Sequence, residues 1–185
     1  MEKKTEWIRG SWANTTAMVC MALMTAITCI LAPLSVPVGP IPVSLTNLVL
    51  CFSVVLLGKK KASFSFLIYL LMGLAGVPVF SGFSAGPAKL VGPTGGYLLG
   101  FFLLTWIGGF FVERFPGKRL LYAVGMTIGM MGLYAFGTVW YMILMKTSDL
   151  WYALSVCVLP FLIFDAVKIA MACIVGETIR KRIKY

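Results

Sequence analysis

The sequence predicts an all-α membrane protein: a six-transmembrane-helix bundle with cytoplasmic N and C termini, and with Pro/Gly-rich outer loops over a ligand pocket. Three observations lead to this fold class: an apolar composition, six apolar segments, and basic residues that alternate between the connections. Of the 185 residues, 60% are hydrophobic and 12% are charged. Soluble domains carry about a quarter charged residues, so this composition indicates lipid as the surrounding solvent.

Six segments are apolar enough to be expected to cross a membrane core about 30 Å thick. The second and third are short, and the six spans are approximately Ala13–Ala32, Val43–Leu57, Ala62–Val79, Thr94–Val112, Leu120–Met145 and Tyr152–Gly176. Each span must pack against its neighbours to bury its polar groups. We therefore expect one transmembrane domain over residues 1–185.

Lysine and arginine residues alternate between the two sides of these spans. Thirteen of the 16 precede the first span, join the second to the third, join the fourth to the fifth, or follow the sixth. The other connections carry Lys89 and Lys146, and Lys168 lies inside the last span. Short basic loops stay in the cytoplasm, which predicts cytoplasmic termini. The alternation favours this topology over a lipid-binding or nucleic-acid-binding explanation of the +10 net charge, and we expect no nucleic-acid partner.

Two loops on the predicted outer side are rich in proline and glycine. Pro33–Pro42 contains four prolines, which prevent a helix and stiffen the chain. Gly76–Gly96 also contains apolar residues, including Phe80 and Phe83. Irregular backbone is tolerated at membrane depth only where protein or a cavity surrounds it. These loops therefore predict a covered pocket that opens to the outside.

Asp165 and Lys168 are the charged residues of the predicted sixth span, and their spacing puts them on one face of a helix. Ionisable residues within a span are costly and usually mark a ligand site or a transport pathway. The alternative is an ion pair that fixes helix packing. We favour the ligand site, because buried ion pairs stabilise a fold only weakly.

Other polar and small residues leave two explanations open. Thr46, Asn47 and Ser84 would either line a pocket or cap helix ends. Ala22 and Ala26 form a small-x-x-x-small pattern, which allows close approach of a partner helix or of a helix within the chain. The same pattern at Gly96-x-x-x-Gly100 and at Gly125-x-x-x-Gly129 predicts packing within the chain.

Several kinds of chemistry are not expected from this sequence. The chain has no histidine, and its five cysteines form no C-x-x-C pair, so we expect no metal or redox site. It has no G-x-x-x-x-G-K-[ST] motif, so ATP hydrolysis would have to come from a partner. An intramembrane enzyme is disfavoured, because no nucleophile–base motif is present. A membrane scaffold would have little reason to carry Asp165 and Lys168 together.

Several runs of the sequence resemble the BioY family of biotin transporters. They are Gly73-Leu-Ala-Gly-Val-Pro-Val-Phe-Ser81, Leu90-Val-Gly-Pro-Thr-Gly-Gly-Tyr-Leu98, Pro40-Ile-Pro-Val-Ser-Leu-Thr-Asn47 and the Asp-x-x-Lys pattern of Asp165 and Lys168. The resemblance implies the substrate-binding S component of an energy-coupling factor (ECF) transporter in a prokaryotic plasma membrane. Such a subunit is not an enzyme; it needs no cofactor and binds biotin as the transported ligand. Its partners would be a transmembrane coupling subunit and two cytoplasmic ATPase subunits.

The resemblance also implies which residues bind the vitamin. The pocket would include Asp165 and Lys168, together with Ser84 and Thr46 as polar ligands. Asp165 can accept a hydrogen bond from a ureido N–H, while Lys168 can donate to the ureido carbonyl or hold Asp165 ionised. Phe80 would cover the ring of the ligand.

One further role follows from the same resemblance, and a second follows from the chemistry of biotin, whose carboxylate needs a donor. Ala22 and Ala26 would lie on the helix that docks on the coupling subunit, and Lys89 is a candidate to bind the carboxylate of biotin. An S component for another vitamin, such as thiamine or riboflavin, remains the alternative ligand assignment.

Overall fold

The computed structural model describes residues 15–36, 42–147 and 149–182, and this part of the chain is helical apart from one short hairpin and its loops. The basic residues before Thr15 and the middle of the first proline-rich loop lie outside the described residues. The elements are α2 (Thr15–Leu31), β1 (Ser35–Val36), β2 (Val43–Ser44), α3 (Thr46–Leu74), α4 (Ala88–Val91), α5 (Gly95–Arg114), α6 (Arg119–Met145), α7 (Leu150–Cys157), α8 (Leu159–Met171), a π-helical turn η2 (Ala172–Gly176) and α9 (Glu177–Arg182).

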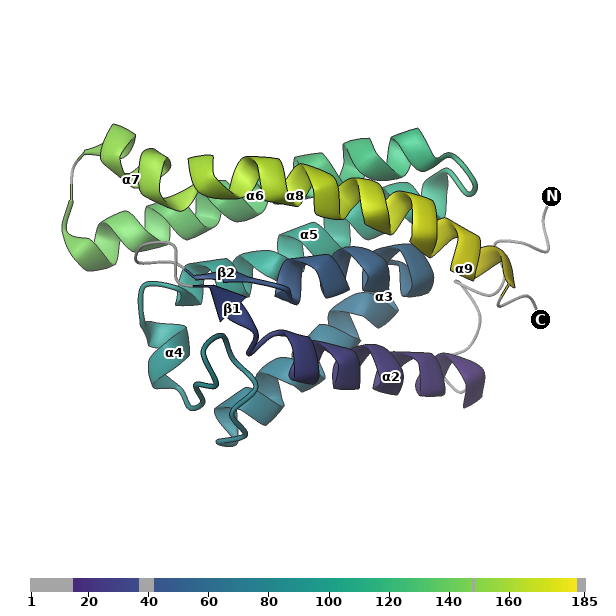
Figure 1. The fold of residues 1–185 in the computed structure, drawn as a ribbon, viewed down its shortest axis with the longest axis horizontal. Coiled ribbons are helices and arrows are strands. Elements are labelled where there is room, and N and C mark those ends of the chain that lie inside the picture. Colours follow the sequence, from purple (N-terminus) through teal and green to yellow (C-terminus); the bar gives the residue numbers. More distant parts are fainter. Residues whose placement is uncertain (1–14, 37–41, 148, 183–185) are drawn as a thin grey trace.

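The long helices form an elongated bundle (Figure 1). Helix α5 packs against both α6 and α3, and α2 packs against α3. The β1–β2 hairpin and α4 lie at one end of the bundle, whereas α9 and the α5–α6 connection lie at the other (Figure 1). The hairpin is antiparallel and pairs Ser35 with Ser44.

Helix α3 corrects the boundaries predicted for the second and third spans. The sequence predicts separate helices at 43–57 and 62–79, joined by a loop that contains three lysines. The prediction of this loop is wrong, because the lysines are helical. Only Gly58 leaves the helical conformation, with φ 75° and ψ −176°, a region that glycine enters without strain. The chain reverses there, and the following lysines already belong to the second half of α3 (Figure 1).

The predicted sixth span is also interrupted. It corresponds to α7, α8 and η2, with a break at Val158, where φ is −123° and ψ is −52°. Pro160 follows in the first turn of α8, where its missing N–H leaves no helical bond unmade. At the start of α7, the Asp149 carboxylate accepts a hydrogen bond of 3.0 Å from the Tyr152 N–H.

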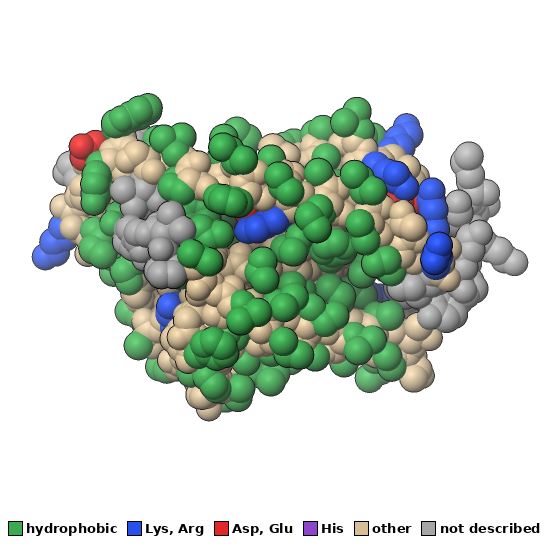
Figure 2. Space-filling view, viewed as in Figure 1, with side chains coloured by type: hydrophobic (Ala, Val, Ile, Leu, Met, Phe, Trp, Pro, Cys, Tyr) green, Lys and Arg blue, Asp and Glu red, His purple; other side chains and the backbone are tan. Residues whose placement is uncertain are grey.

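Three helices of the described chain are long and apolar enough to cross a membrane: Gly95–Arg114, Arg119–Met145 and Leu159–Arg182. Helix Thr15–Leu31 is apolar but shorter. The surface agrees with a lipid environment, because Leu120, Ile143 and Ile163 leave 71–78% of their area exposed. Figure 2 shows hydrophobic side chains over most of this face, with Lys and Arg gathered at the α9 end.

The two Gly-x-x-x-Gly patterns pack within the chain, as predicted. A Cβ atom at Gly129 would lie 3.0 Å from the Leu104 Cα, and one at Gly100 would lie 3.3 Å from the Leu133 Cα. These glycines therefore let the backbones of α5 and α6 approach closely.

Candidate ligand-binding site

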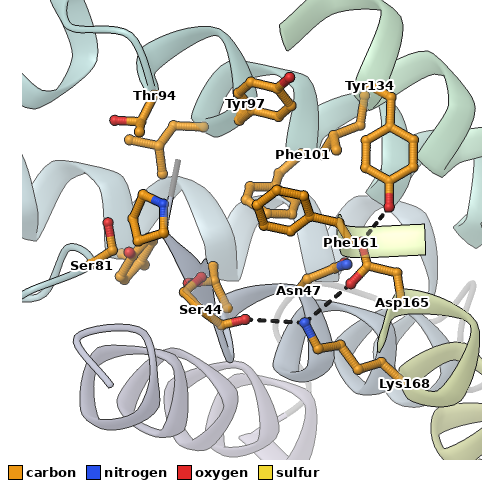
Figure 3. Close-up of a pocket in the computed structure, with 15 residues that line it drawn as sticks. Ser44, Asn47, Ser81, Thr94, Tyr97, Phe101, Tyr134, Phe161, Asp165 and Lys168 are labelled. Atoms are coloured by element: carbon orange, nitrogen blue, oxygen red, sulfur yellow. Dashed lines mark hydrogen bonds and ion pairs between the residues drawn. The ribbon is translucent and has the colours of Figure 1, made fainter. Parts of the chain in front are cut away.

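A pocket of about 660 Å³, part of it open to the surroundings, lies between the helices toward the hairpin end (Figure 3). Residues from α3, α5, α6, α8 and the loops line it: Pro42, Ser44, Thr46, Asn47, Tyr69, Ser81, Thr94, Tyr97, Leu98, Phe101, Leu133, Tyr134, Phe161, Asp165 and Lys168.

Asp165 and Lys168 form a buried ion pair in this pocket. Lys168 Nζ lies 3.1 Å from Asp165 Oδ1, and the two residues are only 4% and 9% exposed. The hydroxyl of Tyr134, on α6, donates to Asp165 Oδ2 at 2.5 Å (Figure 3). Each carboxylate oxygen thus has one protein donor and keeps a lone pair for a ligand.

Lys168 also connects α8 to the hairpin. Its Nζ donates to the backbone carbonyl of Ser44, in β2, at 3.2 Å. The hydroxyl of Ser44 donates to Thr46 Oγ1 at 3.0 Å, at the first turn of α3. The structure therefore brings together Asp165, Lys168 and Thr46, three of the residues that the sequence placed in the pocket.

Phe80 lies behind the pocket rather than in its lining. Its side chain is fully buried, and its ring packs edge-on against Tyr69 with centroids 5.6 Å apart. A Cβ atom at Gly73 would lie 2.1 Å from the Phe80 ring, so only glycine leaves room for it there. Phe80 therefore supports the aromatic wall that Tyr69 presents to the pocket.

The structure does not bring Ser84 or Lys89 into the lining, and it places Ser81 there instead. Ser84 Oγ donates to the Ser81 carbonyl at 2.9 Å, within a tight turn in which the Phe80 N–H also bonds to the Ser84 carbonyl. Lys89 Nζ donates to the same Ser81 carbonyl at 3.3 Å. Partial burial lowers the pKa of the Lys89 ammonium.

The Gly-Pro-Thr-Gly-Gly-Tyr run positions lining residues through close packing. Trp140 Nε1 donates to the Gly92 carbonyl at 3.1 Å, and a Cβ at Gly96 would lie 2.3 Å from Trp140 Cβ. A Cβ at Gly95 would lie 1.7 Å from the Leu90 carbonyl oxygen. These contacts fix the start of α5, from which Thr94 and Tyr97 face the pocket (Figure 3).

Sequence reasoning missed Tyr134 and Phe161. Phe161 is indistinguishable from the other apolar residues of its span. Tyr134 could have been identified as a site residue from the sequence. It lies in the middle of an apolar segment, away from the interfaces where membrane tyrosines are common. A buried tyrosine hydroxyl needs a partner, and here the partner is Asp165.

Ala22 and Ala26 lie on the exposed side of α2. The opposite side of the helix, which includes Met21 and Thr25, is buried against α3. Thr25 Oγ1 and Ser65 Oγ are hydrogen-bonded at 2.9 Å in that interface. Among the described residues, the Ala-x-x-x-Ala face is therefore not used for packing within the chain.

Comparisons with known proteins point to one family. The BioY family model matches residues 1–185. The chain is 35% identical to a probable biotin transporter BioY from Pyrococcus horikoshii, over 86% of this chain and 93% of that protein. It is 34% identical to the biotin transporter BioY of Thermotoga maritima, over 89% and 95%. A crystal structure of the S-component for biotin from an ECF-type ABC transporter matches with a TM-score of 0.83 and 26% identity, over 90% of this chain and 91% of that one.

Proposed function

Because the chain belongs to the BioY family, we propose that it captures biotin and serves as the S component of an ECF-type ABC transporter. The observation that carries this proposal is the pocket, which combines a buried ion pair with apolar and aromatic walls. Biotin has a polar ureido group, an apolar sulfur ring and a carboxylate tail. An ionised carboxylate can accept from a ureido N–H, and the aromatic residues can cover the ring.

The pocket residues take distinct roles in this proposal. Asp165 accepts from the ligand, while Lys168 and Tyr134 hold its two oxygens in place. Thr46 and Ser81 supply further polar groups. Ser84 contributes through its bond to Ser81, and Phe80 contributes by supporting Tyr69.

The membrane arrangement is part of the same proposal. We infer a multi-pass protein of a prokaryotic plasma membrane, with six crossings in a single domain over residues 1–185 and with cytoplasmic termini. The pocket then faces outward, because Pro42 and Ser44 line it, and the hairpin lies at the end away from α9 and the basic side chains gathered there (Figures 1 and 2). A coupling subunit would dock on the face of α2 that carries Ala22 and Ala26, and two ATPase subunits would supply ATP hydrolysis.

Direct ligand binding tests the proposal. The purified full chain, without partners, is incubated with labelled biotin and with unlabelled biotin, thiamine or riboflavin as competitors. We expect saturable binding that unlabelled biotin alone displaces. Failure of labelled biotin to bind, together with saturable binding of labelled thiamine or riboflavin, would assign the pocket to another vitamin.

A further inference from the structure

Asn47 is a pocket residue whose polar atoms have only weak partners. It lies in the first turn of α3, is 6% exposed and lines the pocket. Its Nδ2 donates to Met130 Sδ at 3.6 Å, and its Oδ1 accepts from Cys51 Sγ at 3.8 Å. Within the described chain, these two sulfur groups are its hydrogen-bond partners. Sulfur is a weak acceptor and a thiol is a weak donor, so a buried amide in this setting calls for an explanation.

The thioether fixes which way the amide faces. A methionine sulfur can only accept a hydrogen bond, so the NH₂ group must be the part that faces Met130. The carbonyl oxygen then faces Cys51, one helical turn along. The amide retains one N–H and one lone pair, and a carboxamide can present an N–H and a lone pair side by side on the edge that joins its nitrogen and oxygen.

We propose that Asn47 determines ligand specificity by pairing this amide edge with one edge of the ureido ring of biotin. This inference rests on the proposed function. A cyclic urea presents an N–H and its C=O side by side, which complements the C=O and N–H of a carboxamide. Asp165 accepts from the second ring N–H. Figure 3 shows Asn47 at the same end of the pocket as Asp165 and Lys168. Asn47 and Asp165 can therefore bind the two N–H edges of one ureido ring.

The weak sulfur partners make the proposal testable, because an apolar replacement breaks no strong bond within the protein. In Asn47→Leu, an apolar side chain with the same number of heavy atoms and the same branching meets Met130 and Cys51, which are themselves compatible with an apolar neighbour. We expect the ligand-free variant to unfold at the same temperature as the parent or higher. Its affinity for biotin should fall by about tenfold to a hundredfold, because two ligand hydrogen bonds are lost.

One ligand and one variant serve as controls, and a second substitution at Asn47 is held in reserve. Desthiobiotin keeps the ureido ring but lacks the sulfur, so Asn47→Leu should weaken it by the same factor as biotin. Ser53→Ala removes a buried hydroxyl on the same helix, which bonds to Val49 and does not line the pocket, and should leave the affinity unchanged. If Asn47→Leu does not fold, Asn47→Ala makes the same test without added volume.

The parent chain allows a test without any substitution. In 2-iminobiotin, an imine replaces the ureido carbonyl oxygen that Asn47 would recognise, so we expect at least tenfold weaker binding than for biotin. Equal affinity of the parent for both ligands, or a folded Asn47→Leu variant that binds biotin as tightly as the parent, overturns the inference and leaves the proposed function intact. If the parent chain does not bind biotin, the proposed function fails, and the role of Asn47 fails with it.

Discussion

At the scale of single residues, the ion pair of Asp165 and Lys168 is embedded in a network that reaches three elements. Lys168 bonds to the hairpin at Ser44, and Tyr134 bonds to the carboxylate from α6. Removing Asp165 alone would leave a buried ammonium without its counter-ion, which costs about 3–5 kcal/mol. Loss of binding in that variant would not separate a ligand role from a folding role.

Replacing both charges together separates the two roles. In Asp165→Asn with Lys168→Met, the volumes are similar, no buried charge is left, and the Tyr134 hydroxyl can still donate to the new amide oxygen. We expect the double variant to remain folded in a thermal unfolding assay without ligand. Its affinity for biotin should fall at least tenfold, because a charge-assisted hydrogen bond contributes about 1.5–3 kcal/mol.

A second ion pair provides the matched control. Lys59 and Glu113 lie 3.7 Å apart at the other end of the bundle, outside the pocket lining. The change Lys59→Met with Glu113→Gln should leave the affinity for biotin unchanged. A folded Asp165/Lys168 double variant with the parent's affinity would falsify the assignment of this pair to the ligand.

At the scale of elements, the long uniform helices were predictable and the short irregular ones were not. Spans predicted at Thr94–Val112 and Leu120–Met145 agree with α5 and α6 within two residues, because their apolar runs are long and have clear polar ends. The strands β1 and β2 have two residues each, which is too short for any alternating pattern to be visible.

The immediate restart of α3 after Gly58 depends on contacts from a distant helix. Glu113 Oε1, on α5, accepts a hydrogen bond of 2.9 Å from the Lys59 N–H, which caps the second half of α3. A Cβ at Gly109 would lie 2.4 Å from Lys59 Cα, so α5 approaches this backbone closely. No pattern near Gly58 in the sequence reveals these partners.

Some of the pocket residues could be predicted from the sequence, and others could not. Asp165 and Lys168 stood out because charges within a span are rare. Ser81 and Ser84 lie three residues apart in an irregular loop, and only the fold determines which of them faces the pocket.

The close packing of α5 on Lys59 leads to a prediction about glycine. Gly109→Ala places a Cβ against backbone atoms that cannot move aside, so we expect a loss of about 1–3 kcal/mol in the free energy of unfolding. Gly132→Ala is the matched control, because the nearest atom there is at an ordinary 3.6 Å. Alanine should be neutral at Gly132, or stabilising by up to about 1 kcal/mol. The free energy of unfolding of both variants would be measured in the same detergent. Equal values for the two variants would contradict the close packing of α5 against the kink.

The exposed face of α2 leads to a prediction about docking. Ala22→Trp or Ala26→Trp should block biotin uptake in cells that supply the coupling subunits, because bulk prevents close helix approach. Binding of biotin to the purified variant should remain nearly unchanged, since neither residue lines the pocket. Ile163→Trp, at an exposed position of α8, is the control that should permit uptake. If binding falls as far as uptake, the face serves the fold instead of a partner.

At the scale of the whole molecule, the two ends of the bundle differ in charge and in structure. Basic side chains lie at one end of the bundle, near the Gly58 kink, the α5–α6 connection and α9. The hairpin and α4 lie at the other end (Figures 1 and 2). In a background without native cysteines, Lys146→Cys should react with a membrane-impermeant thiol reagent added to intact cells. Lys60→Cys should react only after the cells are opened. Labelling of position 60 from outside would contradict the proposed orientation.

The reversal of α3 at Gly58 has a consequence for the surrounding bilayer. Residues 46–57 make a helix about 18 Å long, whereas α6 measures about 40 Å. The hydrocarbon core is about 30 Å thick, so residues 46–57 are too short to cross it and α6 is longer than the core. The short helix contributes Val49, Leu50 and Val54 to the buried core, so its neighbours shield it from lipid, whereas the length of the exposed α6 favours a tilt in the bilayer.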